Sequence, residues 1–300
     1  MSKAPARPAS PKRSRQAGAT IRLATLALKV LTPILGDARS RWLVVRGWAI
    51  TTLVLYTLRA QYARALLGIV WTLVTPLLFL AVYLPLFTFV FNMNTKEFEG
   101  DPLAFPIYVI VGFLLWNAFA DGLSNGGTSL VMNLDVVRHS PSPPMLLPTV
   151  KVGTSFVNFM AGSLLVILFL AASGHWPGIR LLLFPVAAGL AFLLTWGLAL
   201  LASALAVYMR DILQMISTLM LIEFFACPLL YPISQVPESM QIYIKMNPFT
   251  PFLTLVRASL IPTQPIAFED VGLAALWAVG TFAVGALTFQ RLEGGFGDAT

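Results

Sequence analysis

Few side chains in this 300-residue sequence could carry out covalent or metal chemistry. Its one cysteine, Cys227, excludes an intramolecular disulfide and a multi-cysteine metal site. The two histidines, His139 and His175, flank a single apolar run long enough to span a membrane. They therefore lie on opposite sides of the membrane and cannot share a metal ion. The glycine pair at 126–127 is not followed by the lysine of a phosphate-binding loop. We therefore expect no catalytic residues, no metal and no cofactor or ATP bound by this chain.

The residues that could bind a ligand lie just before the first long apolar run. Arg59, Tyr62 and Arg64 form a compact polar patch there. Guanidinium groups pair well with phosphate oxygens, so this patch is a candidate contact for an anionic head group. The same side chains could simply extend to membrane lipid, and the sequence leaves both interpretations open.

Aromatic residues recur every four positions in the same apolar run, at Phe79, Tyr83, Phe87 and Phe91. At 100° per residue, each step of four turns the stripe by about 40°, so the four rings share one slowly winding face of a helix. Such a face could stack on the apolar faces of passing sugars in a channel. It could equally contact lipid or a neighbouring helix.

One acidic residue, Glu223, stands inside an otherwise uncharged run. It follows Asp211 by 12 residues, which in a helix is about 18 Å and places it near the middle of a bilayer. A charge at that depth costs about 2.5–3.5 kcal/mol. Glu223 should therefore face a wet channel or a partner helix, and the sequence favours neither.

The composition of the chain indicates that membrane-spanning helices position these candidate residues. The chain is 57% hydrophobic and 11% charged, with a mean hydropathy of +0.79, which excludes an ordinary soluble domain. The first 64 residues hold 12 of the 20 basic residues and one acid, whereas the rest holds 8 bases and 12 acids. Basic residues beside apolar spans mark the cytoplasmic side, so this charge indicates orientation rather than binding of nucleic acid.

The apolar runs predict an all-α polytopic protein of the bacterial inner membrane, with both termini cytoplasmic. Residues 1–41 form a basic, largely disordered segment, and residues 42–64 are too short in their apolar middle to span, so we expect an interfacial amphipathic helix. A seventh span is the alternative for 42–64. Six transmembrane helices are predicted at 66–91, 106–130, 152–174, 181–207, 212–232 and 271–290.

Between the fifth and sixth spans lies an apolar segment, 233–262, that is punctuated by prolines. Its two short apolar pieces, 240–246 and 252–261, cannot cross a bilayer. Proline spacing predicts two brief re-entrant helices on the outer side, and irregular backbone at membrane depth is stable only where protein or water covers it.

Several of these segments together resemble the membrane subunit of ABC-2 type exporters, in particular the permease for lipid-linked polysaccharide such as O-antigen. The match begins with LRAQYARALLGIVWTLVTPLL and continues through YVIVGFLLWNAFADGLSNGG, which contains Trp116. It is most specific in RDILQMISTLMLIEFFACPLLYPISQVPE and MNPFTPFLTLVRASLI. The loop RHSPSPPMLLP departs from the family pattern. The resemblance covers residues 42–298, the expected ABC-2 transmembrane domain.

The resemblance implies a unit of two copies of this chain and two ATP-binding subunits, which carry the phosphate loop, ATP and Mg²⁺. The substrate would be a polyprenyl-pyrophosphate-linked polysaccharide, whose pyrophosphate Arg59, Tyr62 and Arg64 would attract. Residues assigned to the channel lining are Phe79, Tyr83, Phe87, Phe91, Trp116 and Glu223. An outer gate would comprise Tyr231, Pro232, Asn247 and Pro248. Contact with the ATP-binding subunit would involve Asp135, Val136, Val137, Arg138 and His139.

Other transported substrates remain open, namely capsule polymer, a teichoic-acid precursor or another amphiphile. A polytopic membrane transferase would need clustered acidic or basic residues on one membrane face, and the sequence shows none. A secondary transporter would need several buried ionisable residues, of which only Glu223 is evident.

Overall fold

The computed structural model describes residues 50–58, 103–139 and 143–296, together with residues 70, 71, 74, 78, 81, 82, 85 and 86. The chain divides into two units, Met1–Tyr56 and Thr57–Thr300, and the helices discussed below belong to the second. Residues 50–58 are helical, inside the predicted interfacial helix. The described residues are helices and connecting turns without a β-strand, which confirms the all-α prediction for this part of the chain.

Four helices in the described part are long and apolar enough to cross a membrane. They are α4 (Ala104–Thr128), α6 (Leu146–Ala172), α7 (Phe184–Tyr208) and α11 (Phe268–Leu292). Each has 25 or 27 residues and is therefore about 38–40 Å long, enough for about 30 Å of hydrocarbon. They coincide with the second, third, fourth and sixth of the predicted spans, and a 3₁₀ helix, Gly178–Leu183, precedes α7.

The helix at the fifth predicted span is shorter than expected. Helix α8 (Asp211–Ala226) has 16 residues, about 24 Å, and ends six residues before the expected boundary at 232. Its C-cap, Cys227, is extended, with φ −89° and ψ 153°. Cys227 precedes Pro228, and a proline disfavours the helical conformation of the residue before it. The first predicted span, 66–91, lies mostly outside the described residues, so a total of six spans is not established.

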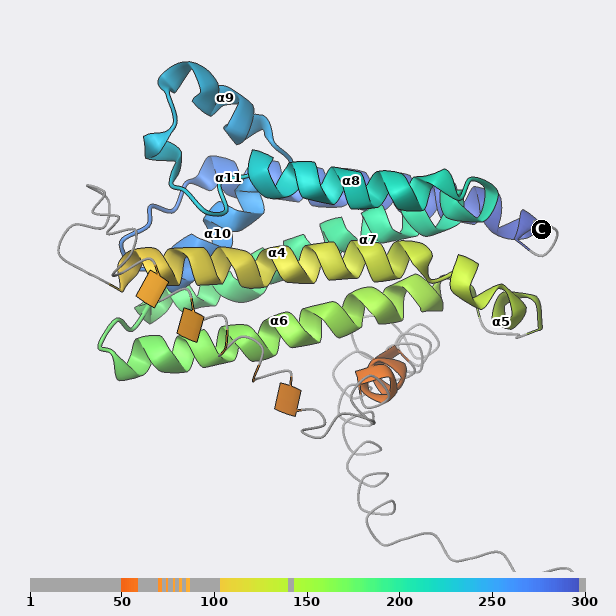
Figure 1. Ribbon diagram of the computed structural model, residues 1–300, viewed down its shortest axis with the longest axis horizontal. Helices are drawn as coiled ribbons and strands as arrows, with labels where there is room; N and C mark the ends of the chain where they lie inside the picture. The colour runs from red at the N-terminus through yellow and green to blue at the C-terminus, as the bar shows by residue number, and fades with distance from the viewer. Residues whose placement is uncertain are drawn as a thin grey trace, which may run out of the picture. The chain divides into compact units, whose positions relative to one another are not determined.

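Two short helices occupy the region after α8. Helices α9 (Glu238–Met246) and α10 (Thr250–Leu260) follow a single 3₁₀ turn, Ile233–Gln235. Prolines define where they begin, because Pro237 is the N-cap of α9 and Pro251 lies in the first turn of α10. Helix α5 (Leu134–His139) and the C-terminal end of α11 lie at the opposite end of the long helices from α9 and α10 (Figure 1).

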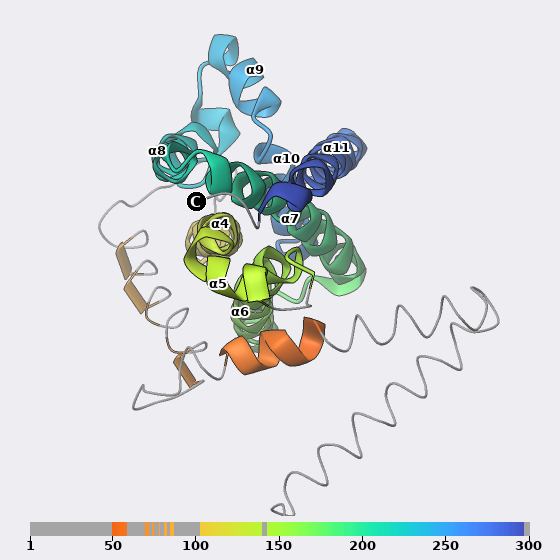
Figure 2. The ribbon, with the colours of Figure 1, turned by 90° about the vertical axis from the view of Figure 1, so that its right-hand side faces the viewer.

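The long helices pack around α4 and α7. Helix α4 contacts α6, α7 and α8, whereas α11 packs along α7 (Figure 2). The α7–α11 crossing is close because both helices have glycine there. A Cβ at Gly197 would lie 2.5 Å from the backbone N of Phe282, and one at Gly285 would collide with the Gly197 carbonyl.

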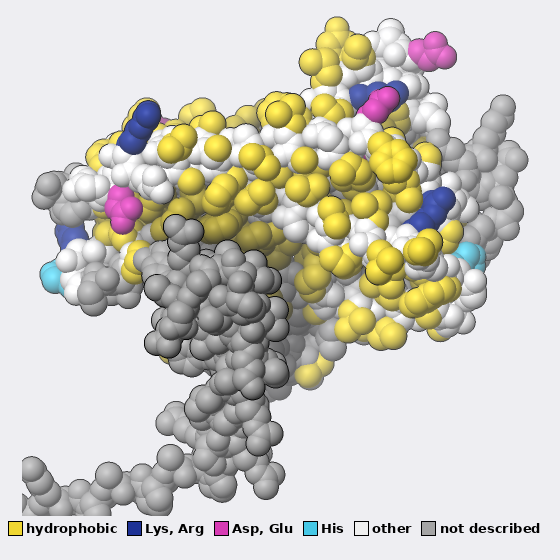
Figure 3. All heavy atoms as spheres, turned by 180° about the vertical axis from the view of Figure 1, so that it is seen from behind, with side chains coloured by type: hydrophobic (Ala, Val, Ile, Leu, Met, Phe, Trp, Pro, Cys, Tyr) yellow, Lys and Arg dark blue, Asp and Glu magenta, His cyan; other side chains and the backbone are white. Residues whose placement is uncertain are grey.

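The exterior of these helices is largely apolar. Figure 3 shows hydrophobic side chains across the middle of the visible face and charged side chains toward its two ends. Large exposed side chains include Leu221 and Phe225 on α8 and Leu276 and Leu287 on α11. An apolar belt between charged ends is the surface expected of a protein embedded in lipid.

Candidate functional site

One arginine holds together three separate parts of the chain. Arg257, on α10, is 1% exposed, although it stands in an otherwise apolar helix. Its Nε donates to the Tyr108 carbonyl at 3.1 Å, Nη1 to Pro228 O at 2.7 Å and Nη2 to Leu229 O at 2.8 Å. The guanidinium carbon also lies 3.5 Å from the centroid of the Tyr108 ring. Helix α10 is thereby joined to α4 and to the segment that follows α8.

Local sequence explains why this pocket accepts a guanidinium group. The break at Pro228 leaves the carbonyls of Pro228 and Leu229 outside any helix, so they need donors from elsewhere. Arginine presents five donors in a planar fork that can reach several acceptors at once. Gly112 on α4 leaves the space for it, because a Cβ there would collide with Nη2 of Arg257. We name the interaction of Arg257 with Tyr108, Pro228 and Leu229 the arginine anchor.

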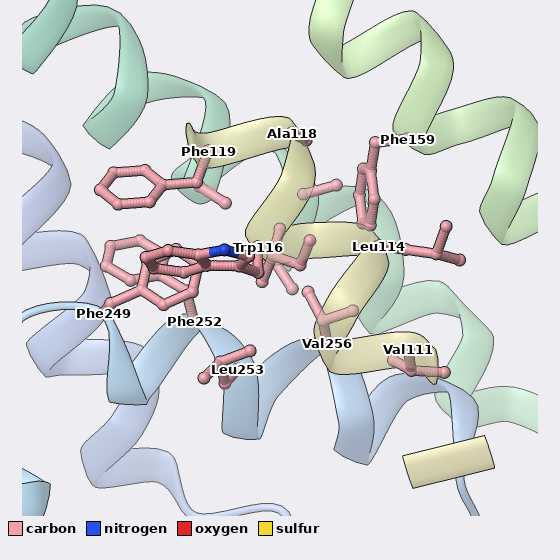
Figure 4. Close-up of a cluster of buried hydrophobic side chains, with 14 of the residues drawn as sticks. Val111, Leu114, Trp116, Ala118, Phe119, Phe159, Phe249, Phe252, Leu253 and Val256 are labelled. Atoms are coloured by element: carbon pink, nitrogen blue, oxygen red, sulfur yellow. The ribbon is translucent and has the colours of Figure 1, made fainter. Parts of the chain in front are cut away.

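Aromatic rings pack between α4 and α10 (Figure 4). The Phe119 and Phe249 rings stack with centroids 4.5 Å apart, and Trp116 meets Phe249 edge-on at 5.7 Å. Phe224 of α8 also contacts Trp116, at 5.6 Å. The Trp116 side chain is 6% exposed and faces the interior of its own chain. Its place here is in helix packing, and channel lining by Trp116 stays a prediction.

The structure brings together two of the residues singled out from the sequence, Glu223 and Asn247. The side chain of Asn247 lies next to the half-buried carboxyl group of Glu223 and interacts with it. Asn247 Oδ1 also accepts from the backbone N–H of Phe249 at 2.7 Å, a turn that leads into α10. Glu223 Oε1 is buried and finds no hydrogen-bond partner among the described residues. Glu223 thus has capacity for a further donor, from water or from a ligand.

The other predicted gate residues flank the same region. The Tyr231 hydroxyl donates to the Phe225 carbonyl at 3.2 Å, which fixes the chain just beyond the arginine anchor. Pro232 is buried, whereas Pro248 is exposed in the link between α9 and α10. All four predicted gate residues therefore lie within the segment that connects α8 to α10.

The predicted contact for the ATP-binding subunit lies on α5. Asp135, Arg138 and His139 are exposed, and His139 Nδ1 lies 2.9 Å from the Asp135 carbonyl. Val137 packs against buried residues that include Phe289 near the end of α11. The Val136 side chain lies outside the described part. Helix α5 is thus a charged projection at the opposite end of the long helices from α9 and α10 (Figure 1).

The remaining predicted site residues lie outside the described residues. They are Arg59, Tyr62, Arg64, Phe79, Tyr83, Phe87 and Phe91. Within the described residues, no group of three or more His, Cys, Asp or Glu side chains is placed to hold a metal ion.

The role of Arg257 was not evident from the sequence. The signal was present, because a single cation in the apolar helix TPFLTLVRASL must find partners when it is buried. Those partners are backbone carbonyls 28, 29 and 149 residues away, and carbonyl positions leave no trace in residue types.

Comparison with known proteins places this architecture among transport proteins. The family model described as ABC-2 type transporter matches residues 49–261. The O-antigen export system permease protein RfbA of Myxococcus xanthus is 30% identical over 244 residues, which is 79% of this chain and 91% of the relative. The protein of the same name from Klebsiella pneumoniae is 23% identical over 82% of this chain and 94% of its own. The polysialic acid transport protein KpsM of Escherichia coli is 17% identical over 83% of this chain and 95% of its own.

Proposed function

Because the chain belongs to the ABC-2 type transporter family, we propose that it is the permease subunit of an ATP-driven exporter of polyprenyl-pyrophosphate-linked polysaccharide. The observation that carries this proposal is the similarity of this chain to permeases named for O-antigen export, which extends over nearly their whole length. A relative named for polysialic acid transport is less similar, so we favour an O-antigen-like substrate over a capsule polymer. We place the chain in the bacterial inner membrane with both termini in the cytoplasm, on the distribution of basic residues.

The working unit that we propose contains two copies of this chain and two ATP-binding subunits. Exposure of α8 supports the pairing of two copies, because Ile216 is the single buried residue among its 16. Leu221 and Phe225 are 64% and 65% exposed, although both are large and apolar. A second copy that covered part of this face would enclose a channel beside Glu223, with Phe79, Tyr83, Phe87 and Phe91 lining it.

The segment from Tyr231 to Pro248 is suited to gate this channel. The arginine anchor holds its beginning, and the Glu223–Asn247 contact holds its end to α8. Between those points, most residues of α9 are exposed and none is buried. We propose that α9 moves while α10 stays fixed to α4, and that Arg59, Tyr62 and Arg64 receive the pyrophosphate at the other side of the membrane.

A cellular test of the function is deletion of this chain followed by analysis of glycan. We expect the deletion strain to lose its surface polysaccharide and to accumulate the polyprenyl-linked polymer inside the cell. Expression of the intact chain should restore the surface polymer. Normal surface polysaccharide in the deletion strain would remove this substrate class from consideration.

The exposed charges of α5 provide a test of coupling to the ATP-binding subunit. We expect the double variant Asp135→Ala, Arg138→Ala to bind that subunit about tenfold more weakly, because two solvent-facing charges are lost from the contact. Co-purification from detergent at several salt concentrations measures the effect. The control is Glu238→Ala, which removes an exposed charge from α9 at the opposite end. Equal co-purification of the double variant and the control would exclude α5 as the contact.

A further inference from the structure

Two cavities on the surface of the described part meet at α11. The first, about 350 Å³, runs between α7 and α11 and is lined by Leu198, Leu201, Leu276, Trp277, Gly280, Thr281 and Val284. The second, about 850 Å³, lies among α9, α10, residues 263–267 and the beginning of α11. Leu276 and Trp277 line both cavities, so the two adjoin at these side chains, and together we call them the groove. We infer that this groove binds one membrane phospholipid with a zwitterionic, primary-ammonium head group, as in phosphatidylethanolamine.

The first cavity has the character of a site for a hydrocarbon chain. Its lining side chains are apolar except Thr281, whose hydroxyl donates to the Trp277 carbonyl at 2.7 Å and is thereby satisfied. From Leu276 to Val284 the cavity follows about 12 Å of helix. Gly280 forms part of the floor, and a Cβ added there would meet nothing within 4 Å. Apolar surface of this kind is covered by an acyl chain at no cost in hydrogen bonds.

The second cavity has polar and charged side chains in its wall as well as apolar ones, and one of its hydroxyl groups is unpaired. Thr250 is 3% exposed, and its Oγ1 finds no hydrogen-bond partner among the described residues. Beside it, Thr254 Oγ1 donates to the Pro251 carbonyl at 2.9 Å. Buried hydroxyl groups are nearly always paired, so the Thr250 hydroxyl indicates that a polar ligand or water belongs at this position.

Charge in the second cavity selects the kind of head group. Its lining contains the cation Lys245 and the two acids Glu269 and Asp270. Arg257 also lines the cavity, but it is 1% exposed, and its guanidinium group is already held by three carbonyls and the Tyr108 ring. A pyrophosphate group would therefore bring its negative charges next to two carboxylates with one available lysine. A phospholipid with one phosphate and one ammonium group matches the charges that line this cavity, because Lys245 can bind the phosphate and the two acids can bind the ammonium.

The test measures lipid retained by the full chain in detergent. Purified protein is mixed with equal amounts of phosphatidylethanolamine and phosphatidylglycerol, and the bound lipid is counted by native mass spectrometry. We expect one phosphatidylethanolamine per chain, retained about tenfold over phosphatidylglycerol. The double variant Glu269→Gln, Asp270→Asn should bind the two lipids equally, because the ammonium group loses its partners.

A steric variant tests the hydrocarbon half of the groove without altering charge. Gly280→Leu places a side chain in the cavity and should lower retention of both lipids about tenfold. Its matched control is Gly272→Leu, also on α11 and also with open space at Cβ, at a position that lines neither cavity. Folding of each variant is checked by its elution from a sizing column.

Three results of the lipid measurements would overturn the inference. Wild-type protein could retain the two lipids equally, Gly280→Leu could retain as much lipid as Gly272→Leu, or a polyprenyl-pyrophosphate lipid could displace phosphatidylethanolamine. A fourth arm tests whether another copy of the chain covers the groove. Thr281→Cys should stay monomeric on oxidation in lipid nanodiscs if a phospholipid occupies the site, whereas a high yield of disulfide-linked dimer would contradict it.

Discussion

Replacing Arg257 with alanine is expected to abolish the folded state of this protein in detergent. The carbonyls of Pro228 and Leu229, which lie outside any helix, would lose their donor, and the Tyr108 carbonyl inside α4 would lose its second one. A buried polar group left without a partner costs about 1–3 kcal/mol, and two such losses are comparable with the lower end of the total stability of many proteins, about 5–15 kcal/mol. The measurement is the unfolding temperature and the amount of monodisperse protein recovered after solubilisation.

Matched variants separate the arginine anchor from a general loss of charge. Arg257→Lys keeps the charge but not the planar fork, so an intermediate loss of stability is expected. Gly112→Ala should also destabilise the protein, because the new methyl group collides with Nη2. Arg180→Ala serves as the control, since Arg180 Nη1 donates to one carbonyl, that of Gln264, at 2.6 Å. If Arg257→Ala unfolds at the same temperature as Arg180→Ala, the arginine anchor does not stabilise the fold.

The second large effect is expected at the crossing of α7 and α11. Gly285→Leu would drive a branched side chain into the backbone of Gly197, where even a Cβ collides. Because both partners are backbone atoms, the helices can relieve the collision only by separating. We expect the variant to lose the packing of α11 and to appear as aggregated or proteolysed protein. Fluorescence-detected size exclusion of a tagged chain measures the folded fraction.

The control for this variant lies on the same crossing helices. Gly189→Leu, on α7, adds the same side chain at a position where a Cβ meets nothing within 4 Å. We expect it to elute like the unmodified chain. Equal elution of Gly285→Leu and Gly189→Leu would show that α7 and α11 do not need this close approach.

Hydrophobic runs predicted the long helices well because a membrane span is set by length and apolarity. Helix ends were less accurate, for two reasons visible in particular residues. Lys151 was expected to precede the third span, yet α6 begins at Leu146 and includes it. In the opposite direction, α8 is shorter than its apolar run, because Pro228 ends the helix early. Charge and hydropathy locate the span in the bilayer, whereas backbone chemistry decides where the helix stops.

The candidate site could be predicted only in part. The sequence predicted two short helices in 233–262 and singled out Glu223 and Asn247, which the structure joins. It did not predict that the Trp116 indole packs against Phe249, which is 133 positions away in the sequence. Contacts between distant segments depend on how helices pack, and the arginine anchor depends on free carbonyls. Neither is encoded by residue type at a single position.

Export in a reconstituted system tests the central claim most directly. The chain and its ATP-binding subunit are inserted into liposomes that contain polyprenyl-pyrophosphate-linked polysaccharide, and a lectin measures glycan that reaches the far side. We predict that lectin-accessible glycan increases only when both subunits and ATP are present. Active ATP hydrolysis by the same complex without movement of the glycan would contradict a role in polysaccharide export.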